Sequence, residues 1–302
     1  MDNILITGAG GFVGGYLIRK MLDMGYGVIG VSGKNVNELY DLQGNEHYIH
    51  ITMNIKDRES YKQLYKHADK IKVIVHLAAD IRIPGDDETI DANCKASYYL
   101  AEFAKEYGIG KFINISSVPV IGRPIYSPID EMHPVNPGTV YHATKYAAEK
   151  IIEVVCGENT DVMNLRIASP IGVGMNPYNF LSLVLKKCQN DGDIILYGQG
   201  KRIQSYIDVR DVCRAVVAGV QSSSRGLYLI SGPAGISNYE LAVMCRNITC
   251  SKSNIILSDN YDSQANIDWS LNGEKALKDL GYKYKYDLNE CVEWIINKGE
   301  RQ

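Results

Sequence analysis

The sequence predicts an α/β protein, in which a doubly wound parallel sheet is followed by a smaller C-terminal α/β region. Two observations carry this prediction. Short apolar runs rich in β-branched residues alternate with helical patterns through the first half of the chain, which is typical of a parallel sheet covered by helices on both faces. After Arg166 this rhythm breaks, and prolines and glycines interrupt the stretch that follows. The 302 residues, of which 45% are hydrophobic and 22% charged, are enough to bury such cores.

The first half of the chain contributes the sheet. We place its strands at residues 3–7, 27–32, 47–52, 73–77, 111–116 and 161–166. Helices are predicted at 12–24, 57–67, 88–107 and 138–157. This alternation is that of a doubly wound, Rossmann-type nucleotide-binding domain. We set its boundaries at residues 1–168 and expect the chain to return to it around 205–231.

The remaining residues, 169–302, are predicted to form a cap over the sheet. A strand is expected at 205–209 and another at 226–231. Helices are predicted near 178–190, 209–221, 237–248, 272–280 and 287–298.

Bulk properties exclude several kinds of partner. The formal net charge of −3 and the isoelectric point near 6.1 provide no basic field, so we expect no nucleic-acid partner. No apolar run reaches the roughly 18 to 20 residues of a membrane span, so we expect a cytoplasmic protein with no membrane partner. The seven cysteines show no Cys-x-x-Cys spacing and the histidines no His-x-x-x-His pair. We therefore predict reduced, mostly buried thiols and no metal site.

A glycine-rich turn lies between the first predicted strand and the first predicted helix. Gly8, Gly11 and Gly14 follow the apolar run 4–6 and precede a helical pattern. At such a turn, backbone N–H groups and the positive end of the helix dipole converge on one small volume, which suits a phosphate. Val13 stands where the common dinucleotide fingerprint has its last glycine, so the spacing is Gly-x-x-Gly-x-x-Gly instead. We predict that this turn binds the pyrophosphate of a dinucleotide.

Three residues could carry chemistry. Tyr141 and Lys145 stand four positions apart in a helical pattern and therefore share one face. A neighbouring ammonium group favours the phenolate and is expected to lower the pKa of Tyr141 from about 10, which would make the phenol a usable general acid and base. Ser117 follows the strand 111–116 at the carboxyl edge, where open sheets bind ligands. Its hydroxyl could donate a further hydrogen bond to a substrate oxygen.

In the order and spacing of these residues, the chain resembles the extended short-chain dehydrogenases/reductases of the NAD-dependent epimerase/dehydratase family. That group includes UDP-galactose 4-epimerase and many nucleotide-sugar ketoreductases. Further similar segments are His76 to Ala79, Asn93, Asp130-Glu131 with Pro137, Asn164 to Arg166 with Ser169-Pro170 and Gly172, Tyr197 to Gly200, Tyr206 to Val212, Lys275-Ala276 and Leu280 to Tyr282.

The resemblance implies a role for each matching position. Lys145 would hold the nicotinamide ribose, Tyr141 would exchange a proton with the sugar oxygen, and Ser117 would orient that oxygen. The cofactor-binding positions would be Gly8, Gly11, Phe12, Val13, Gly14, Asn54, Ile55, Leu77, Ala78, Ala79 and Asn93, with Tyr141 and Lys145. The substrate-binding positions would be Ser117, Ser169, Asn179, Tyr197, Arg202 and Gln204.

The cofactor choice depends on the end of the second predicted strand. An acidic residue there would bind the ribose 2′-hydroxyl of NAD, but the chain has Ser32 and Lys34. A serine and a lysine suit a 2′-phosphate better, so NADP is preferred to NAD as the cofactor.

The reaction is narrowed by the residues that follow Ser117. Dehydratases of the resembled family have an acidic pair at this point, whereas Val118 and Pro119 cannot move a proton. Dehydration is therefore the least expected of the family's reactions. Because reductive steps use NADP, whereas epimerases of this type usually keep NAD bound, the NADP preference favours a 4-ketoreductase of a nucleotide-linked sugar, with the 4-epimerase as the first alternative. A reductase of a smaller carbonyl compound and a non-catalytic dinucleotide-binding sensor or scaffold are the others, and the intact Ser117, Tyr141 and Lys145 set speaks against the last.

The substrate end of the site departs from the family pattern. Gln204 stands where nucleotide-sugar enzymes have the first of two arginines that bind the diphosphate, and 255–268 contains no arginine. Lys201, Arg202 and Arg210 are candidates to compensate, and surface charge is the alternative for each.

The resemblance also implies a homodimer that forms through the helices near 88–107 and 138–157. The apolar residues expected on its contact face are Tyr98, Tyr99, Phe103, Ala147, Ala148 and Ile152.

Overall fold

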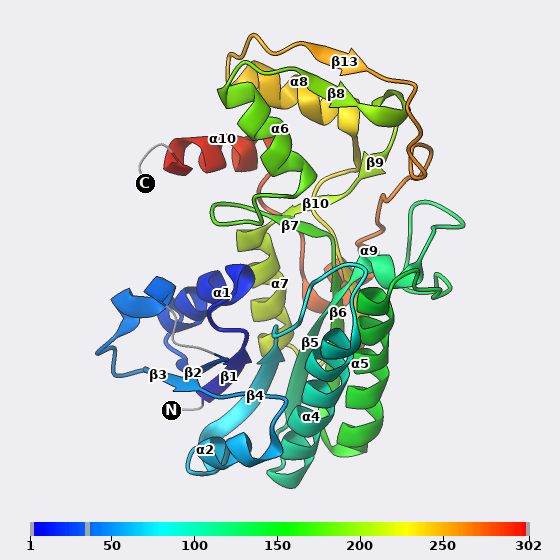
Figure 1. The fold of residues 1–302 in the computed structure, drawn as a ribbon. Helices are drawn as coiled ribbons and strands as arrows, with labels where there is room; N and C mark the ends of the chain where they lie inside the picture. Colours follow the sequence, from blue (N-terminus) through cyan, green and yellow to red (C-terminus); the bar gives the residue numbers. More distant parts are fainter. Residues whose placement is uncertain (1–2, 34–36, 300–302) are drawn as a thin grey trace.

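A computed structural model describes residues 3–33 and 37–299, and seven of its strands form one parallel sheet (Figure 1). Across the sheet the order is β11, β6, β5, β4, β1, β2, β3, and every neighbouring pair runs parallel. The bounds are β1 Asn3–Thr7, β2 Gly27–Ser32, β3 Tyr48–Thr52, β4 Ile71–His76, β5 Lys111–Ser117, β6 Asp161–Ile167 and β11 Gly226–Ile230. This confirms the predicted doubly wound sheet.

Helices cover both faces of the sheet, as Figure 1 shows. On one side lie α1 (Phe12–Asp23) and α7 (Val209–Gln221), and on the other α4 (Ala96–Glu106) and α5 (Val140–Cys156). Successive residues of β1 enter opposite cores because strand side chains alternate: Ile4 and Ile6 belong to the core under α1 and α7, and Leu5 to the core under α4 and α5. Strands buried on both faces explain the continuous apolar runs in the sequence.

Two predicted helices differ from the structure. The helix expected at 57–67 is a 3₁₀ turn, Arg58–Tyr61, followed by the single turn α2 (Lys62–Tyr65). Tyr61 and Leu64 are its buried side chains, which is too little apolar surface to stabilise a longer helix. The helix expected at 88–107 contains α3 (Asp87–Ile90), a π-helical turn (Asp91–Lys95) and α4.

The C-terminal region has its own core, built from helices and short strand pairs. This core includes Leu181, Val184, Leu241, Cys245 and Val292. The elements are β7 (Ser169–Ile171), α6 (Phe180–Gln189), β8 (Ile194–Leu196), β9 (Ile203–Gln204), β10 (Tyr206–Asp208), β12 (Ile236–Ser237), α8 (Asn238–Ile248), β13 (Ile255–Leu257), α9 (Glu274–Leu280) and α10 (Leu288–Gly299). The predicted strand 205–209 is β10, which pairs with β7 and does not join the main sheet. The division of the chain after residue 168 stays a prediction.

Half of the residues expected on a dimer face are buried in the protein core. Phe103, Ala148 and Ile152 are at most 3% exposed, because these sides of α4 and α5 pack toward the sheet. That part of the prediction is wrong. All seven cysteines are unpaired, and five of them are buried. No helix among the described residues is long and apolar enough to span a membrane.

Candidate active site

The candidate site lies at the edge where β1, β4 and β5 end. Because the strands are parallel, the Gly8 turn, the loop 77–86 and Ser117 all leave the sheet at this edge. Tyr141 and Lys145 lie in the first turns of α5, which packs against β5 and the 3₁₀ turn Val118–Ile121. The fold therefore brings the predicted cofactor turn and the predicted catalytic residues to one edge.

The glycine turn is closed by its own backbone. The Gly11 N–H donates to the Gly8 carbonyl at 2.9 Å, and Gly8 has a φ of +72°, which favours glycine. A Cβ at Gly14 would lie 2.1 Å from the Gly8 oxygen, so no side chain fits there. α1 begins at Phe12 with no side-chain cap and no acidic residue in its first turn. The positive end of its dipole is thus available to an anion.

His76 fastens the loop after β4 to the glycine turn. Its Nδ1 lies 2.7 Å from the Thr7 hydroxyl and its Nε2 lies 3.1 Å from the Ser97 hydroxyl. The same Thr7 oxygen accepts a hydrogen bond from the Ala78 N–H at 3.2 Å. Complete burial, with the charge of Lys145 added, lowers the pKa of His76 to about 3, so the ring is uncharged at neutral pH. The backbone at Ala78 consequently lies close to Gly8. A Cβ added at Gly8 would be 2.8 Å from the Ala78 nitrogen.

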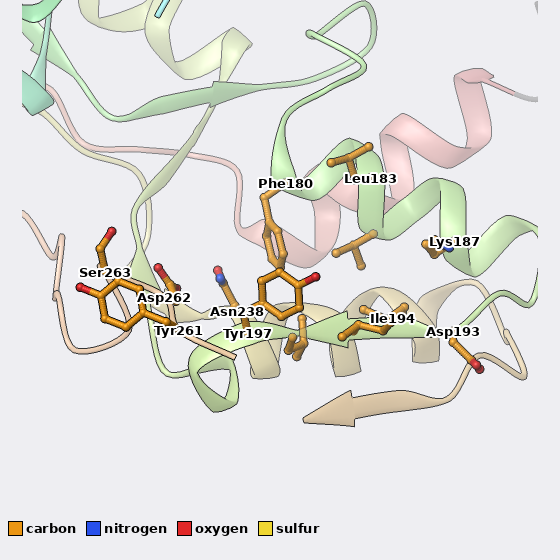
Figure 2. Close-up of a pocket in the computed structure, with 13 residues that line it drawn as sticks. Phe180, Leu183, Lys187, Asp193, Ile194, Tyr197, Asn238, Tyr261, Asp262 and Ser263 are labelled. Atoms are coloured by element: carbon orange, nitrogen blue, oxygen red, sulfur yellow. The ribbon is translucent and has the colours of Figure 1, made fainter. Parts of the chain in front are cut away.

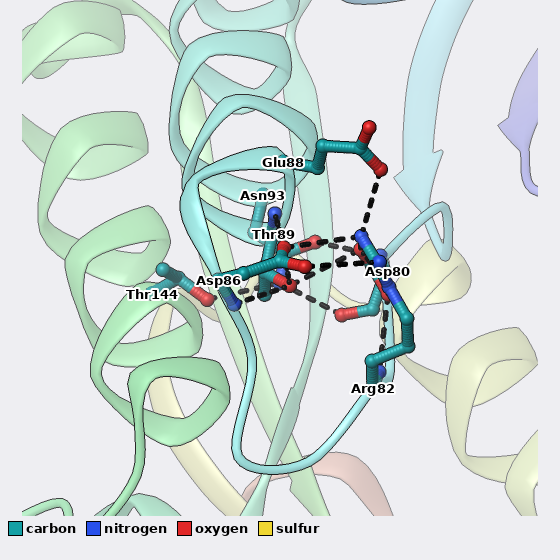
Figure 3. A network of polar contacts seen from close by, with 7 residues as sticks. All are labelled: Asp80, Arg82, Asp86, Glu88, Thr89, Asn93 and Thr144. Atoms are coloured by element: carbon teal, nitrogen blue, oxygen red, sulfur yellow. Dashed lines mark hydrogen bonds and ion pairs between the residues drawn. The ribbon is translucent and has the colours of Figure 1, made fainter.

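Asn93, in the π-helical turn, ties the same loop to α5 (Figure 3). Its side-chain oxygen accepts from the Asp80 N–H at 2.8 Å, and its amide donates to the Asp80 carbonyl at 3.0 Å and to the Thr144 hydroxyl at 2.9 Å. Arg82 adds ion pairs to Asp80, Asp86 and Glu88, although these are largely exposed. Asn93 is 1% exposed and its polar atoms bond within the chain, so it supports the loop 77–86 from behind.

Burial displaces the pKa values of the predicted acid–base pair. The Tyr141 N–H donates to the Pro84 carbonyl at 3.0 Å, which joins the loop 77–86 to the start of α5. Burial raises the pKa of Tyr141 to about 12, opposite to the direction predicted from its lysine neighbour, because loss of hydration disfavours the charged phenolate. Burial lowers the pKa of Lys145 to about 8, and the charge of Glu149 opposes this shift. At neutral pH the phenol is therefore protonated and Lys145 is mostly charged.

The predicted adenosine end lies beyond β2 and β3. The Ser32 hydroxyl lies 3.0 Å from Nε2 of His50 on β3. Lys34, the second residue behind the NADP preference, lies outside the described residues. Asn54 is exposed, with its side-chain oxygen accepting from the Lys56 N–H at 3.1 Å, and Ile55 beside it is half-buried.

A cavity of about 560 Å³ opens in the C-terminal region (Figure 2). Its volume falls within the range of roughly 300–1,000 Å³ typical of small-molecule sites. Side chains of α6 and β8 give it apolar walls, and Tyr197 lies at the end of β8. The lining residues are Phe180, Leu183, Val184, Lys187, Asp193, Ile194, Ile195, Leu196, Tyr197, Asn238, Tyr261, Asp262 and Ser263.

Of the predicted substrate-binding residues, Tyr197 lines this cavity and is 54% exposed. Asn179 caps α6, with its side chain accepting from the Ser182 N–H at 2.8 Å. Ser169 is exposed at the start of β7. The Gln204 amide donates at 2.6 Å to Asn238, a cavity residue.

The three candidate cations near Gln204 differ in their surroundings. Arg210 forms an ion pair with Asp208 at 2.6 Å and stacks on Tyr286 and Trp294, so its role is structural. Lys201 is exposed. Arg202 is half-buried, and its Nε is buried without a hydrogen-bond partner.

These observations place an uncapped glycine turn at the same sheet edge as a partly buried tyrosine and a buried lysine. The family model described as the NAD dependent epimerase/dehydratase family matches residues 4–230. The chain belongs to the NAD-dependent epimerase/dehydratase family. A putative UDP-glucose 4-epimerase of Methanocaldococcus jannaschii is 24% identical to it over 97% of both chains.

Solved structures share the fold across the whole of this family member. The UDP-glucose 4-epimerase of Thermotoga maritima, solved with UDP-glucose, superimposes with a TM-score of 0.88 at 24% identity over 99% of both chains. The dTDP-glucose 4,6-dehydratase of Bacillus anthracis, solved with NAD, gives a TM-score of 0.87 at 21% identity, covering 100% of this chain and 97% of that one. The C-terminal region is thus part of the shared architecture.

Sequence reasoning about this epimerase/dehydratase family member missed two kinds of residue. Glu149 forms a buried ion pair with Arg166 one helical turn beyond Lys145, and its four-residue spacing from that lysine was a usable signal. The apolar walls of the cavity, on α6 and β8, carry no motif and resemble ordinary core residues in the sequence.

Proposed function

We propose that this protein is an NAD-dependent 4-epimerase of a nucleotide-linked sugar. The observation that carries this proposal is the placement of the partly buried Tyr141 and the buried Lys145, four residues apart on α5, at the sheet edge that also presents the uncapped glycine turn. Relatives that match the chain over nearly its full length are epimerases and dehydratases of nucleotide sugars, which supports the substrate class.

The residues at the sheet edge fit a dinucleotide. The turn at Gly8, Gly11 and Gly14 would hold the pyrophosphate against the N–H groups of Phe12 and Val13. Further contacts are proposed from Ser32, Asn54, Ile55, Leu77, Ala78 and Ala79, with Asn93 supporting the last of these from behind. When bound, NAD supplies the hydride acceptor and donor.

We propose NAD in place of the NADP that Ser32 and Lys34 favoured. The Ser32 hydroxyl lies within hydrogen-bond distance of His50, which leaves it less suited to a 2′-phosphate. The solved dehydratase relative carries NAD, which supports this choice.

The protein's part in the chemistry is to move one proton and to hold the sugar in place. A phenol with a pKa of about 12 stays protonated at neutral pH, which is the form that delivers a proton to a ketone oxygen. The positive charge of Lys145 stabilises the phenolate that results, and the Ser117 hydroxyl would donate to the same oxygen. In the opposite direction, Tyr141 as phenolate would accept the proton of the sugar hydroxyl while hydride leaves C4 for the cofactor, which gives the ketone.

The nucleotide is proposed to occupy the 560 Å³ cavity, with its base against Tyr197. The Arg202 carbonyl accepts from the Asn238 N–H at 2.9 Å, so Arg202 adjoins the cavity wall. A guanidinium with a buried, unpartnered Nε suits a diphosphate, and we propose that Arg202 takes the part for which Gln204 is unsuited.

An NMR assay of nucleotide sugars tests the proposed function. The purified chain is incubated with NAD and either UDP-glucose or dTDP-glucose, and the products are followed by ¹H NMR. We expect the C4 epimer to accumulate toward equilibrium without net NADH formation.

Other products would contradict the proposal in distinct ways. A 4-keto-6-deoxy sugar would identify a dehydratase, a reaction for which Val118 and Pro119 provide no acid. Consumption of NADH or NADPH with a 4-keto nucleotide sugar, without epimerisation, would identify a ketoreductase. NAD binding without turnover of any nucleotide sugar would favour a smaller carbonyl substrate or a non-catalytic role.

A further inference from the structure

A buried ion pair lies directly beyond the predicted catalytic residues on α5. Glu149 is 1% exposed and Arg166 is 2% exposed. Nε of Arg166 donates to Oε1 of Glu149 at 2.9 Å, and a terminal nitrogen donates to Oε2 at 2.8 Å. This is the bidentate arrangement of a guanidinium and an ionised carboxylate. The Ser116 hydroxyl donates to Oε1 as well.

The sheet and the helix present these groups in register. Ser116 on β5 and Arg166 on β6 are paired neighbours, and both reach Glu149 on the helix above them. Two residues earlier on the same strands, Asn114 and Asn164 form an equivalent pair. The Asn164 amide donates to Glu153 at 2.7 Å. Glu149 and Glu153 thus mark two successive attachment points of α5 on the sheet.

The attachment points continue the line of the predicted catalytic residues. Tyr141, Lys145, Glu149 and Glu153 follow one another at four-residue spacing and so share one side of α5. Glu149 is one turn from the buried Lys145, whereas Glu153 is two turns away and forms an exposed ion pair with Lys150.

Glu149 is the negative charge that acts on Lys145. The other titratable groups whose charges interact with Lys145 are Cys94 in the π-helical turn and His76 on β4. Tyr141 precedes Lys145 by one turn of α5. Burial raises the pKa of Tyr141 and of Cys94 and lowers that of His76, so all three are uncharged at neutral pH. Glu149 therefore acts on two buried cations: it pairs directly with Arg166, and its charge acts on Lys145 one helical turn away.

We propose that Glu149 is a positioning residue, whose carboxylate, shared between Arg166 and Lys145, sets the charge of Lys145 beside Tyr141. Arg166 and Ser116 hold that carboxylate in place and limit how much of its field reaches the lysine. The strength of the Glu149–Arg166 pair thereby determines the pH at which the lysine loses its proton.

Removing the anion or the cation of the ion pair should shift the pKa of Lys145 in opposite directions. Glu149→Gln keeps the size of the side chain but removes its charge, which leaves two cations together. We expect the pKa of Lys145 to fall from about 8 by about one pH unit or more. Arg166→Met removes the competing cation and leaves the carboxylate to the lysine. We expect the pKa of Lys145 to rise in that variant.

The measurement needs neither substrate nor cofactor. The chain is labelled with [ε-¹³C]lysine, and the Lys145 signal is identified by its absence from Lys145→Met. Its chemical shift is then followed against pH for the unmodified chain and for each variant, with circular dichroism as the check on folding. Glu153→Gln is the matched control, since it makes the same change from carboxylate to amide at the second attachment point, two turns from Lys145. The pKa of Lys145 in this variant should match that of the unmodified chain.

A purely structural ion pair predicts a different outcome. Both variants would then lose stability while the pKa of Lys145 stayed unchanged or moved in the same direction, and either result would overturn the proposal. If Glu149→Gln does not fold, the pKa of Lys145 in Arg166→Met tests the proposal by itself. Failure here would leave the proposed epimerase activity standing, because the titration does not depend on turnover.

Discussion

Tyr141 and Lys145 show how burial dominates at the level of single residues. Both side chains lie in the first turns of α5, and burial favours the uncharged form of each. The sequence placed them correctly on one helix face, but their pKa values depend on hydration, which sequence spacing does not contain. The phenol is consequently protonated at neutral pH, and in the proposed mechanism it acts as the proton donor in that form.

Replacing the phenol tests its role. We expect Tyr141→Phe to lower kcat for nucleotide-sugar epimerisation by about 10²- to 10⁴-fold, because the proton donor is lost while the ring remains. NAD affinity, measured by calorimetry, should change little. Tyr126→Phe is the control, since Tyr126 bonds to Asp130 at the surface. Unchanged turnover in Tyr141→Phe would remove Tyr141 from the chemistry.

Among the elements, the loop 77–86 depends on a side chain far from it in sequence. Asn93 bonds to both backbone groups of Asp80 and to Thr144, so one buried amide joins the loop, the π-helical turn and α5. These bonds keep the backbone of Ala78 against Gly8, where the dinucleotide is proposed to bind.

Removing the Asn93 amide should destabilise the loop 77–86. We expect Asn93→Ala to lower the free energy of unfolding by about 1–3 kcal/mol in urea denaturation, because it leaves the buried groups of Asp80 and Thr144 without partners. NAD affinity should fall as well. Asn159→Ala, at an exposed position, is the matched control. Full stability and unaltered NAD binding in Asn93→Ala would show that the loop does not need this attachment.

How far the elements could be predicted depended on their length and burial. The sheet strands are continuous apolar runs, and α1 and α5 have clear helical periodicity, so their positions followed from the sequence. β9 and β12 have two residues each and no pattern to detect. Phe103 and Ile152 looked equally suited to a dimer face and to the core, because an apolar residue is compatible with both until the packing is known.

For the whole molecule, the exposed outer side of α4 and α5 is where we expect self-association. Figure 1 shows these helices side by side on one face of the sheet, and Tyr98 and Val154 are 40% and 79% exposed there. We predict a homodimer through this side, so that Val154→Glu shifts the mass measured by light scattering at micromolar concentration toward the monomer. Met24→Glu, on the far side of the sheet at the end of α1, should have no effect. A monomeric unmodified chain would contradict the prediction.

In the proposed reaction, hydride moves between the sugar C4 and the cofactor, while Tyr141 moves only the proton on oxygen. The most direct test uses UDP-glucose deuterated at C4, incubated in ordinary water with NAD and the purified chain, and locates the label in the product by NMR and mass spectrometry. We expect the C4 epimer to retain its deuterium, because the hydrogen passes to the cofactor and back without entering water. Loss of the label to solvent, or the absence of any epimer, would contradict it.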